Sequence, residues 1–570
     1  MRKLLVLGCS STKRDTHNKL PAVDLYDGPF YRVLRTFLRD HLWPQDLSVA
    51  VLSAEYGLMG GLTHIQTYDR VMTKERAVQL SGDVRHTLLG WRDCHSSIQL
   101  VLGETYLGAI QPAANELWRR SVDLAAGPIG MKLQYLHNAL HRGAKKAPRC
   151  RDDVPSADGR PMYFLPDWDD FVDTNFDFVR DKFSCSARAD RDETHCSALV
   201  KPKRLADGIL VSLAQSFGGK GLLRALQASS PDSLAPKPVK RHFGLADDQW
   251  AFGDCGAFSY VNEESPTISV EQAVATYELY GFDLGASVDH IPVPEVVRKG
   301  KRVTLTDAER RKRVALTRSN AQDFLDLWRR RECRFNPVGI VQALSPRQFA
   351  SSVAEYAEMG YRRIALGGLV PRSDDEILAI VTAVCKKMSS LRQRPWLHLM
   401  GIYRPNLQAA FRRLRVDSFD SATYFRKAWL RSDQNYLGAT GNWYAAIRVP
   451  PSHDPRTAKR LASTGVSLSK IQRLEAAALQ ALRAYAGRRI GIERCLKCVL
   501  HYDLLLPRGE TDAKSMEEAY RRTLSDRPWE LCECPICKKV GIDVLIFRGL
   551  NRNKRRGAHN TLMLYNTIAR

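Results

Sequence analysis

The chain has 570 residues, of which 44% are hydrophobic and 26% are charged, which is typical of a globular protein of roughly two to four domains. No apolar run reaches the roughly 18 residues that a membrane-spanning helix needs, so we expect no membrane partner. The formal net charge of +24 favours a polyanionic partner, most simply nucleic acid, over a merely basic soluble protein.

The thirteen cysteines indicate reduced thiols and metal sites rather than a disulfide framework. The first residues, Met-Arg-Lys-Leu-Leu-Val-Leu-Gly-Cys, are followed at once by polar residues, which indicates a strand and not a signal peptide. We therefore expect a cytoplasmic protein.

Residues 1–142 are predicted to form a small parallel α/β domain. Strands are expected at 4–8, 47–53 and 98–102, and helices at 29–42 and 74–92. Several side chains follow the predicted strand ends, where open α/β sheets bind ligands, although ordinary turn chemistry explains them equally well. These residues are Cys9, Ser10, Lys13, Glu55, Tyr56 and Glu104.

Three short motifs of this domain resemble the YaaA-like family of small α/β domains. They are Gly8-Cys9-Ser10 with Lys13, Asp24-Leu25-Tyr26, and Leu52-Ser53-Ala54-Glu55-Tyr56-Gly57-Leu58. The resemblance implies a role associated with nucleic acid and does not imply a reaction.

A polar stretch rich in charge, Pro and Gly at residues 143–160 is the predicted linker. Eight strand-like runs follow it, mostly ending in glycine or a polar residue, with amphipathic stretches between most of them. They lie at 162–165, 207–212, 250–253, 281–288, 338–341, 363–366, 396–400 and 416–419. This alternation predicts a TIM-like (β/α)8 barrel over residues 161–490, with a doubly wound open sheet as the alternative.

Three aspartates end predicted strands: Asp254, Asp289 and Asp420. Converging carboxylates suit glycosidic chemistry, in which one attacks or stabilises the anomeric carbon and another moves protons. A single aspartate at a strand end is more commonly a helix N-cap. Three in series favour a site, but their spacing assigns no roles.

Six motifs occur in the order seen in tRNA-guanine transglycosylases, and the chain is similar to that superfamily from about residue 161 onward. They are Gly253-Asp254-Cys255-Gly256-Ala257-Phe258-Ser259, Ser287-Val288-Asp289-His290, Gly339-Ile340-Val341-Gln342, Gly367-Gly368-Leu369, Leu399-Met400-Gly401 and Asp417-Ser418-Phe419-Asp420. The forms Pro166-Asp167-Trp168-Asp169-Asp170 and Asp-Cys-Gly-Ala-Phe-Ser-Tyr most resemble the DpdA-type branch, which inserts 7-deazaguanines into DNA.

The resemblance implies a role for each matching residue. Asp420 corresponds to the nucleophile that attacks C1′ and expels guanine, and Asp254 to the general acid/base. In the base pocket, Phe258 corresponds to the aromatic residue that stacks on the base. Asp289 and Gln342 correspond to the residues that hydrogen-bond its edge. The backbone of Gly367, Gly368 and Leu369 corresponds to the pocket lining.

The chain differs from the tRNA enzymes at two places. Val370-Pro371-Arg372 follows the Gly-Gly-Leu motif, and Ser-Ala-Thr-Tyr follows Asp420. These differences leave open the 7-substituent of the base and the use of tRNA.

The C-terminal region, residues 491–570, is predicted to be a zinc-binding basic subdomain. Cys532, Cys534, Cys537 and His559 supply three thiolates and one imidazole, the complete shell of a structural Zn²⁺ site. A second group, Cys495, Cys498 and His501, is predicted to lie on one helix face, where core packing explains it better than an incomplete metal site.

A basic run lies inside the expected zinc loop and suits contact with phosphates, with a solvated charge run as the alternative. Its members are Arg548, Arg552, Lys554, Arg555 and Arg556. A second basic surface is predicted from Lys299, Lys301, Arg302 and the run Arg310–Arg313.

These features predict an enzyme that exchanges guanine in DNA for a preQ0-like 7-deazaguanine through a covalent aspartyl–sugar intermediate. The target nucleotide would then leave the duplex stack. A tRNA-guanine transglycosylase, a non-catalytic nucleic-acid-binding protein and an enzyme that only hydrolyses the base remain as alternatives. The resemblance also implies a homodimer or association with other Dpd-type modification proteins as partners.

Overall fold

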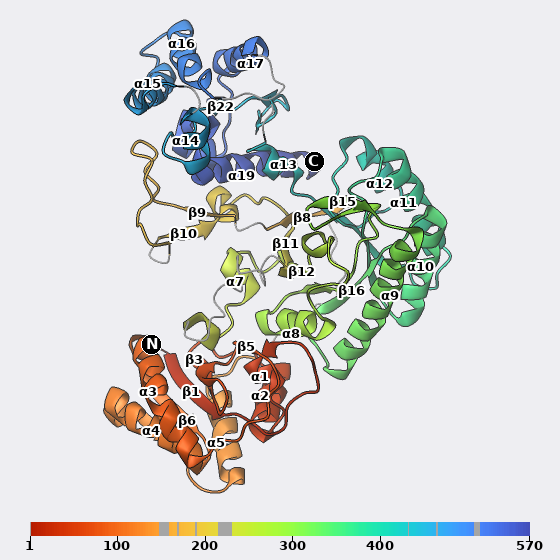
Figure 1. Cartoon of the computed structure of the whole chain (residues 1–570). Coiled ribbons are helices and arrows are strands. Elements are labelled where there is room, and N and C mark those ends of the chain that lie inside the picture. The colour runs from red at the N-terminus through yellow and green to blue at the C-terminus, as the bar shows by residue number, and fades with distance from the viewer. Residues whose placement is uncertain are drawn as a thin grey trace.

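The computed structural model describes residues 2–146, 159–167, 170–188, 191–214, 231–430, 433–462, 465–506 and 513–569. Most of the predicted linker, and Trp168 and Asp169 of the quoted motif, lie outside these ranges. No described helix combines the length and the apolar character needed to cross a membrane. In Figure 1 the N-terminal sheet (red) and the C-terminal helices (blue) lie at opposite ends, with the barrel between them.

The N-terminal part is a five-stranded sheet of order β4-β3-β1-β6-β7. Its strands are β1 (Arg2–Gly8), β3 (Leu47–Ser53), β4 (Gly57–Gly60), β6 (His95–Val101) and β7 (Val122–Leu124). All neighbours are parallel except β4, which pairs antiparallel with β3, so the predicted parallel α/β domain is confirmed with one antiparallel edge strand. A further short pair joins β2 (Leu20–Pro21) to β5 (His64–Ile65).

Alternating side chains of β1 explain why helices cover both faces of this sheet. Leu4 and Val6 pack with α3 (Lys74–Trp91) and α4 (Glu104–Trp118). Leu5 and Leu7 pack on the other face, which is covered by α1 (Ala22–Leu25), α2 (Pro29–Asp40) and α5 (Ile129–His141).

The eight predicted strands after the linker close into a parallel barrel of order β11-β12-β13-β16-β17-β18-β19-β8, which confirms the (β/α)8 fold. They are β8 (Met162–Pro166), β11 (Gly208–Ser212), β12 (Trp250–Asp254), β13 (Leu284–Ala286), β16 (Asn336–Val341), β17 (Arg363–Leu366), β18 (Trp396–Leu399) and β19 (Ser418–Asp420). The last strand closes the ring on the first, with Asp420 opposite Phe164.

Five helices follow barrel strands and lie close to where the amphipathic stretches predict them. They are α8 (Val270–Tyr280), α9 (Asp307–Arg330), α10 (Pro346–Met359), α11 (Asp374–Met388) and α12 (Gln408–Arg413). Serine or threonine caps α8 to α11, with reciprocal capping boxes at Ser269, Thr306 and Ser373. A short helix, α7 (Val239–Phe243), precedes β12.

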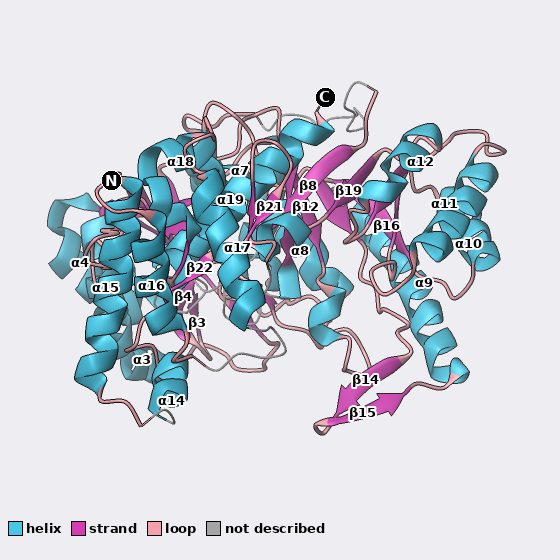
Figure 2. Cartoon of the chain, turned by 90° about the horizontal axis from the view of Figure 1, so that it is seen from above, coloured by secondary structure: helices cyan, strands magenta, loops and turns pink. Residues whose placement is uncertain are grey.

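Two antiparallel pairs interrupt the alternation and were not predicted. One is β9 (Phe171–Asp173) with β10 (Glu193–His195). The other is a hairpin of β14 (Glu295–Arg298) and β15 (Lys301–Thr304), which projects from the barrel in Figure 2.

The C-terminal part is helical. Its helices are α13 (Thr423–Lys427), α14 (Pro455–Ala462), α15 (Leu468–Ala486), α16 (Ile492–Asp503), α17 (Ala513–Asp526), α18 (Pro535–Val540) and α19 (Gly549–Ile568). Short strands β20 (Tyr436–Leu437) and β21 (Trp443–Tyr444) pair with each other, and β22 (Ile447–Arg448) pairs with β23 (Ile546–Phe547). Helices α15 and α16 pack against each other across residue 490, so the division there stays a prediction.

A buried group of charges joins the N-terminal part to the barrel. The carboxylate of Asp24 lies 3.1 Å from Arg14 and 3.1 Å from Arg331, which directly follows α9. Burial alone would raise the pKa of Asp24, but the two guanidinium groups lower it below its ordinary value. This ionised carboxylate therefore ties α1 to the end of a barrel helix.

Candidate active site

The carboxyl ends of the barrel strands bring Asp254, Asp289 and Asp420 into one buried site. Asp254 ends β12, Asp420 ends β19, and Asp289 follows β13 by three residues. Ligand atoms of Asp254, Cys255 and Asp289 lie within 4.8 Å of one another. Asp289 and Asp420 are each 4% exposed. The negative charges of Asp289 and Asp420 both act on Asp254, so the three carboxylates repel one another when ionised.

Asp420 is held by donors on one side. Its Oδ1 accepts a hydrogen bond from the backbone N–H of Gly401 at 2.7 Å and lies 3.1 Å from His398 Nε2. His398 Nδ1 lies 2.6 Å from the hydroxyl of Ser418, its register partner on β19. A serine O–H that donates to Nδ1 leaves the proton on Nε2, where it faces Asp420. This arrangement fixes one oxygen of Asp420.

His398 was not singled out from the sequence. It is completely buried and lies between aromatic rings, with Trp396 stacked at a centroid distance of 5.7 Å. The alternation of side chains along a strand could have indicated its position. Trp396 of β18 points into the interior of the barrel, and His398, two residues later, lies on the same face of the strand.

The surroundings of Asp254 favour its protonated form. Burial, followed by the negative charges of Asp289 and Asp420, raises its pKa to about 8. The backbone N–H of Gly256 donates to Asp254 Oδ2 at 3.0 Å. At neutral pH this carboxyl group is therefore mostly protonated and can act as a general acid.

Asp289 and Gln342 form a fixed polar pair. Gln342 Nε2 donates to Asp289 Oδ2 at 2.7 Å, and the thiol of Cys255 donates to Asp289 Oδ1 at 2.9 Å. The Tyr260 hydroxyl donates to the carbonyl of Asp289 at 2.9 Å and lies 3.1 Å from Cys255 Sγ. Burial raises the pKa of Asp289, and the bonds from Cys255 and Gln342 oppose that rise.

Gln342 keeps one unused acceptor. Its Oε1 atom is buried and has no hydrogen-bond partner among the described residues. Buried acceptors are usually paired, so an unpaired one at a strand end indicates a place for a ligand donor.

The two glycines after β17 make room for Gln342. A Cβ atom on Gly367 would lie 2.1 Å from Gln342 Nε2, and one on Gly368 would lie 2.7 Å from Oε1. Gly368 also has a φ of 66°, which side chains rarely adopt. Leu369 is fully buried beside them. Phe258 behaves differently, because 55% of its surface is exposed in the turn Ala257–Tyr260.

The predicted metal ligands also meet. His559 Nδ1 lies 3.7, 3.4 and 3.4 Å from the sulfurs of Cys532, Cys534 and Cys537. A tetrahedral zinc site with ordinary bond lengths places sulfur and nitrogen about 3.5 Å apart, so the residues fit such an ion.

The surroundings of His559 orient it for metal binding. Its Nε2 lies 2.8 Å from the carbonyl of Leu437, which leaves Nδ1 free to face the sulfurs. The ring of Tyr436 stacks on it at 4.1 Å, and its hydroxyl lies 3.2 Å from Cys537 Sγ. All four ligands are buried, as a structural site requires.

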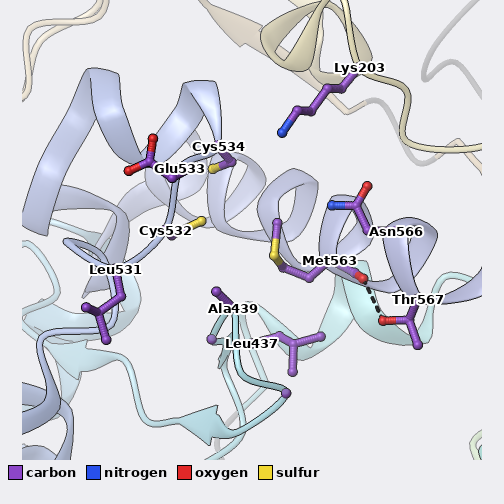
Figure 3. A pocket seen from close by; sticks show the side chains of 12 residues that line it. Lys203, Leu437, Ala439, Leu531, Cys532, Glu533, Cys534, Met563, Asn566 and Thr567 are labelled. Atoms are coloured by element: carbon purple, nitrogen blue, oxygen red, sulfur yellow. Dashed lines mark hydrogen bonds between the residues drawn. The ribbon is translucent and has the colours of Figure 1, made fainter. Parts of the chain in front are cut away.

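A pocket of about 730 Å³, including open solvent, lies beside this cluster (Figure 3). Cys532 and Cys534 line it together with Lys203, Met563 and the loop after β20. The three barrel carboxylates do not line this pocket, so it is separate from the candidate active site.

The prediction of a basic loop that contacts phosphates at the C-terminus is wrong. The four arginines and Lys554 belong to helix α19 or its N-cap, and each arginine is at most 4% exposed. Arg548 pairs with Asp181 and Glu475, and Arg552 with Asp181 and Asp543.

The remaining members of the run bond to backbone carbonyls. Lys554 donates to the carbonyl of Phe171 at 3.0 Å and Arg555 to that of Asp173 at 2.8 Å. Arg556 donates to the carbonyl of Val544 at 2.8 Å. The run therefore packs α19 against the rest of the chain, and its arginines are too buried to contact phosphates.

The second cysteine group and the predicted N-terminal residues do not form a complete binding site among the described residues. Cys495 lies in the core, Cys498 packs against it and His501 is exposed, in agreement with core packing. In the N-terminal part, Cys9 Sγ lies 3.0 Å from the Tyr106 hydroxyl and Lys13 lies over the ring of Tyr68. A ligand site there stays a prediction.

Known proteins match two parts of the chain. Residues 4–138 match a family of unknown function, DUF6884, and residues 258–442 match the family described as queuine tRNA-ribosyltransferase. A protein of Salmonella montevideo named DNA-guanine transglycosylase is 36% identical over 410 residues, which cover 71% of this chain and 96% of that protein. The second match spans the strands that carry Asp289, Gln342 and Asp420. The chain therefore belongs to the tRNA-guanine transglycosylase superfamily and has the barrel of a guanine transglycosylase.

Proposed function

We propose that this protein exchanges guanine in DNA for a 7-deazaguanine base through a covalent Asp420–sugar intermediate. The observation that carries the proposal is the pairing of a carboxyl group whose pKa is raised to about 8, Asp254, with a second carboxylate held by fixed donors, Asp420. One acid and one nucleophile are what a two-step exchange at an N-glycosidic carbon requires.

In the first step an oxygen of Asp420 forms a bond to C1′ while the bond from C1′ to the guanine nitrogen breaks. The electron pair of that bond leaves with guanine, which takes the proton of Asp254. In the second step the incoming base gives its N9 proton to Asp254, its nitrogen bonds to C1′, and the ester bond to Asp420 breaks. The second step returns the proton to Asp254 and frees the carboxylate of Asp420, so no further reactant is needed.

The residues proposed to hold the base suit a planar purine-like ring. The exposed ring of Phe258 offers a stacking face, and the free Oε1 of Gln342 offers an acceptor to an N–H of the base edge. Asp289 provides a second polar contact, and Gly367, Gly368 and Leu369 provide close lining. The preQ0-like form of the base remains part of the proposal.

DNA is the preferred polynucleotide because the relative named DNA-guanine transglycosylase is matched over 96% of its length. Transfer to tRNA is the second candidate, since the family model that matches residues 258–442 is described as a tRNA enzyme. We also propose that the buried Cys3His group binds Zn²⁺, which would hold the C-terminal helices together and take no part in the exchange.

The test is incorporation of radiolabelled guanine into duplex DNA, single-stranded DNA or tRNA. We expect label in DNA, and chase of that label by preQ0. Label in tRNA alone would establish the second candidate, and free guanine released without incorporation would establish a hydrolase. Binding without any label or release would indicate a non-catalytic binding protein.

A further inference from the structure

The hairpin β14–β15 carries an exposed group of positive charges. Lys299, Lys301 and Arg302 are exposed, and none of them forms an ion pair with a carboxylate among the described residues. Two nearby cations are paired: Arg298 with Glu309 at 3.3 Å and Arg310 with Asp307 at 3.6 Å. The acid of the hairpin itself, Glu295, stands at the far end from the tip, opposite Thr304. The tip is therefore cationic.

The turn of this hairpin has a lysine at a position that usually holds asparagine or glycine. Lys299 has a φ of 49° and Gly300 a φ of 76°, so both central residues have the positive φ of a type I′ turn. Asparagine or glycine normally occupies the first position, because other side chains are strained there. The turn therefore places the lysine side chain at the tip of the hairpin, at a position where glycine would be less strained.

Hydrogen bonds connect the hairpin to the rim of the base pocket. The backbone N–H of Val297 donates to Asn262 Oδ1 at 2.8 Å, two residues after the turn that holds Phe258. The buried Arg313 of α9 donates to the carbonyls of Val261, Glu263 and Ile291. The hairpin itself begins six residues after Asp289. It therefore stands at the carboxyl end of the barrel and belongs to the same rim as Phe258.

We propose that this hairpin is the surface that holds the phosphates of the DNA strand beside the target nucleotide. The proposal rests on the proposed function and assigns to the hairpin the role that the buried arginines of α19 do not fill. A two-stranded ribbon is narrow enough to enter a major groove, and lysine and arginine without carboxylate partners are the groups that replace DNA counterions. The contacts carry no sequence information, since phosphates are the same at every step.

The test compares two triple variants that each remove three exposed cations. One is Lys299→Ala/Lys301→Ala/Arg302→Ala. Its control is Lys386→Ala/Lys387→Ala/Arg392→Ala, at and after the C-terminal end of α11 and therefore at the opposite end of the barrel. The measurement is the Kd for a guanine-containing duplex between 50 and 200 mM salt, with the exchange rate at saturating DNA.

We expect the hairpin variant to bind at least ten-fold more weakly at the low salt, and its slope of log Kd against log salt to fall by about 2 to 3, or roughly 0.9 for each lost phosphate contact. The exchange rate at saturating DNA should stay within about two-fold, because no catalytic group is changed. The control should match the wild type. An equal loss in both variants, or in neither, overturns the proposal, as does weaker binding of tRNA with unchanged binding of DNA.

A single substitution distinguishes a loss of DNA binding from a loss of folding. Lys299→Gly removes one charge and relieves the positive φ, so it should weaken DNA binding and reduce the salt slope by about 1 while the melting temperature stays equal or rises. Unchanged affinity in this variant contradicts the role of the tip. The wild-type exchange assay separates the two proposals: incorporation into DNA with unaffected hairpin variants rejects the hairpin alone, whereas no incorporation by the wild type rejects the function.

Discussion

The carboxyl end of the barrel and the helix α19 both bury several charged side chains, but they satisfy them differently. Around α19 each buried arginine has named carboxylate or carbonyl partners. In the barrel, Gln342 Oε1 has no partner among the described residues and two carboxyl groups have raised pKa values. Buried charge that is fully paired marks a place where the fold is held, and buried charge that is poorly paired marks a place where chemistry is done. Five variants would test this contrast.

Asp420→Ala should have the largest effect on activity. Without an oxygen to bond C1′, the exchange rate should fall at least about 10⁴-fold and no covalent complex with DNA should be trapped by denaturation. Asp83→Ala, which removes an exposed carboxylate of α3, is the control and should keep full activity. Full activity in Asp420→Ala would show that another group is the nucleophile.

Cys534→Ser should mainly reduce stability, because it removes one of four ligands from a closed shell. We expect the bound metal to be lost and the melting temperature to fall by about 10 °C or more, measured by elemental analysis and calorimetry. The matched control is Cys94→Ser, an exposed thiol outside the cluster. Retention of one equivalent of zinc by the Cys534 variant would remove this residue from the ligand set.

Arg552→Ala should lower the free energy of unfolding by about 3 to 5 kcal/mol, because it leaves the buried Asp543 and the partly buried Asp181 with less compensating charge. The salt dependence of DNA binding should not change. Arg311→Ala, which removes an exposed arginine of α9, should change stability by less than about 0.5 kcal/mol. Both values come from denaturant unfolding, and equal values for the two variants would contradict the structural role of α19.

Asp254→Asn should separate activity from stability. The pKa of Asp254 is raised in the folded protein to about 8, from an ordinary value of 3.8, so the folded wild type retains a proton that the unfolded chain loses. The wild type therefore loses stability as pH rises from about 4 to about 8, and Asn removes that loss.

For this variant we expect exchange to fall by about 10²- to 10⁴-fold, no gain in stability near pH 4, and a gain of about 5 kcal/mol at pH 9, from roughly 4 pKa units at about 1.4 kcal/mol each. In the wild type the exchange rate should decline above pH 8, as the general acid ionises. A gain that is the same at every pH would show that Asp254 has no raised pKa.

His398→Phe should have the smallest effect of the five. Phenylalanine preserves the aromatic packing with Trp396 but removes the hydrogen bonds to Asp420 and Ser418. The expected loss is about ten-fold in kcat with little change in KM, since the carboxylate that His398 contacts is that of Asp420. His398→Gln should recover part of the loss. A kcat for His398→Phe equal to that of the wild type would leave Gly401 as the sole positioning donor.

Much of the barrel could be predicted from the sequence, because each strand is a short apolar run that ends in glycine or a polar residue. That rule also located Asp254, Asp289 and Asp420, and the structure brings them together. It could not show which basic runs are buried, since a cation looks the same in a sequence whether it faces solvent or a distant carboxylate. Arg552 meets Asp181, 371 residues away in the chain, and no local pattern encodes that contact.

The hairpin was missed for a related reason. Its residues, Glu295–Arg298 and Lys301–Thr304, are dominated by charge, which hides the period-two pattern of a strand. The rule of polar residues at strand ends does not point to His398, because His398 lies one residue inside β18. In both cases tertiary position, and not residue type, decides the role.

Helix α9 connects the N-terminal part of the molecule to the cationic hairpin. Its 24 residues span about 36 Å, from the base of the cationic hairpin to the Arg331–Asp24 contact with the N-terminal part. A helix of this length behaves as a stiff rod. One helix therefore connects the buried contact with the N-terminal part to the base of the hairpin, so a shift of α9 at one end would be passed to the hairpin at the other.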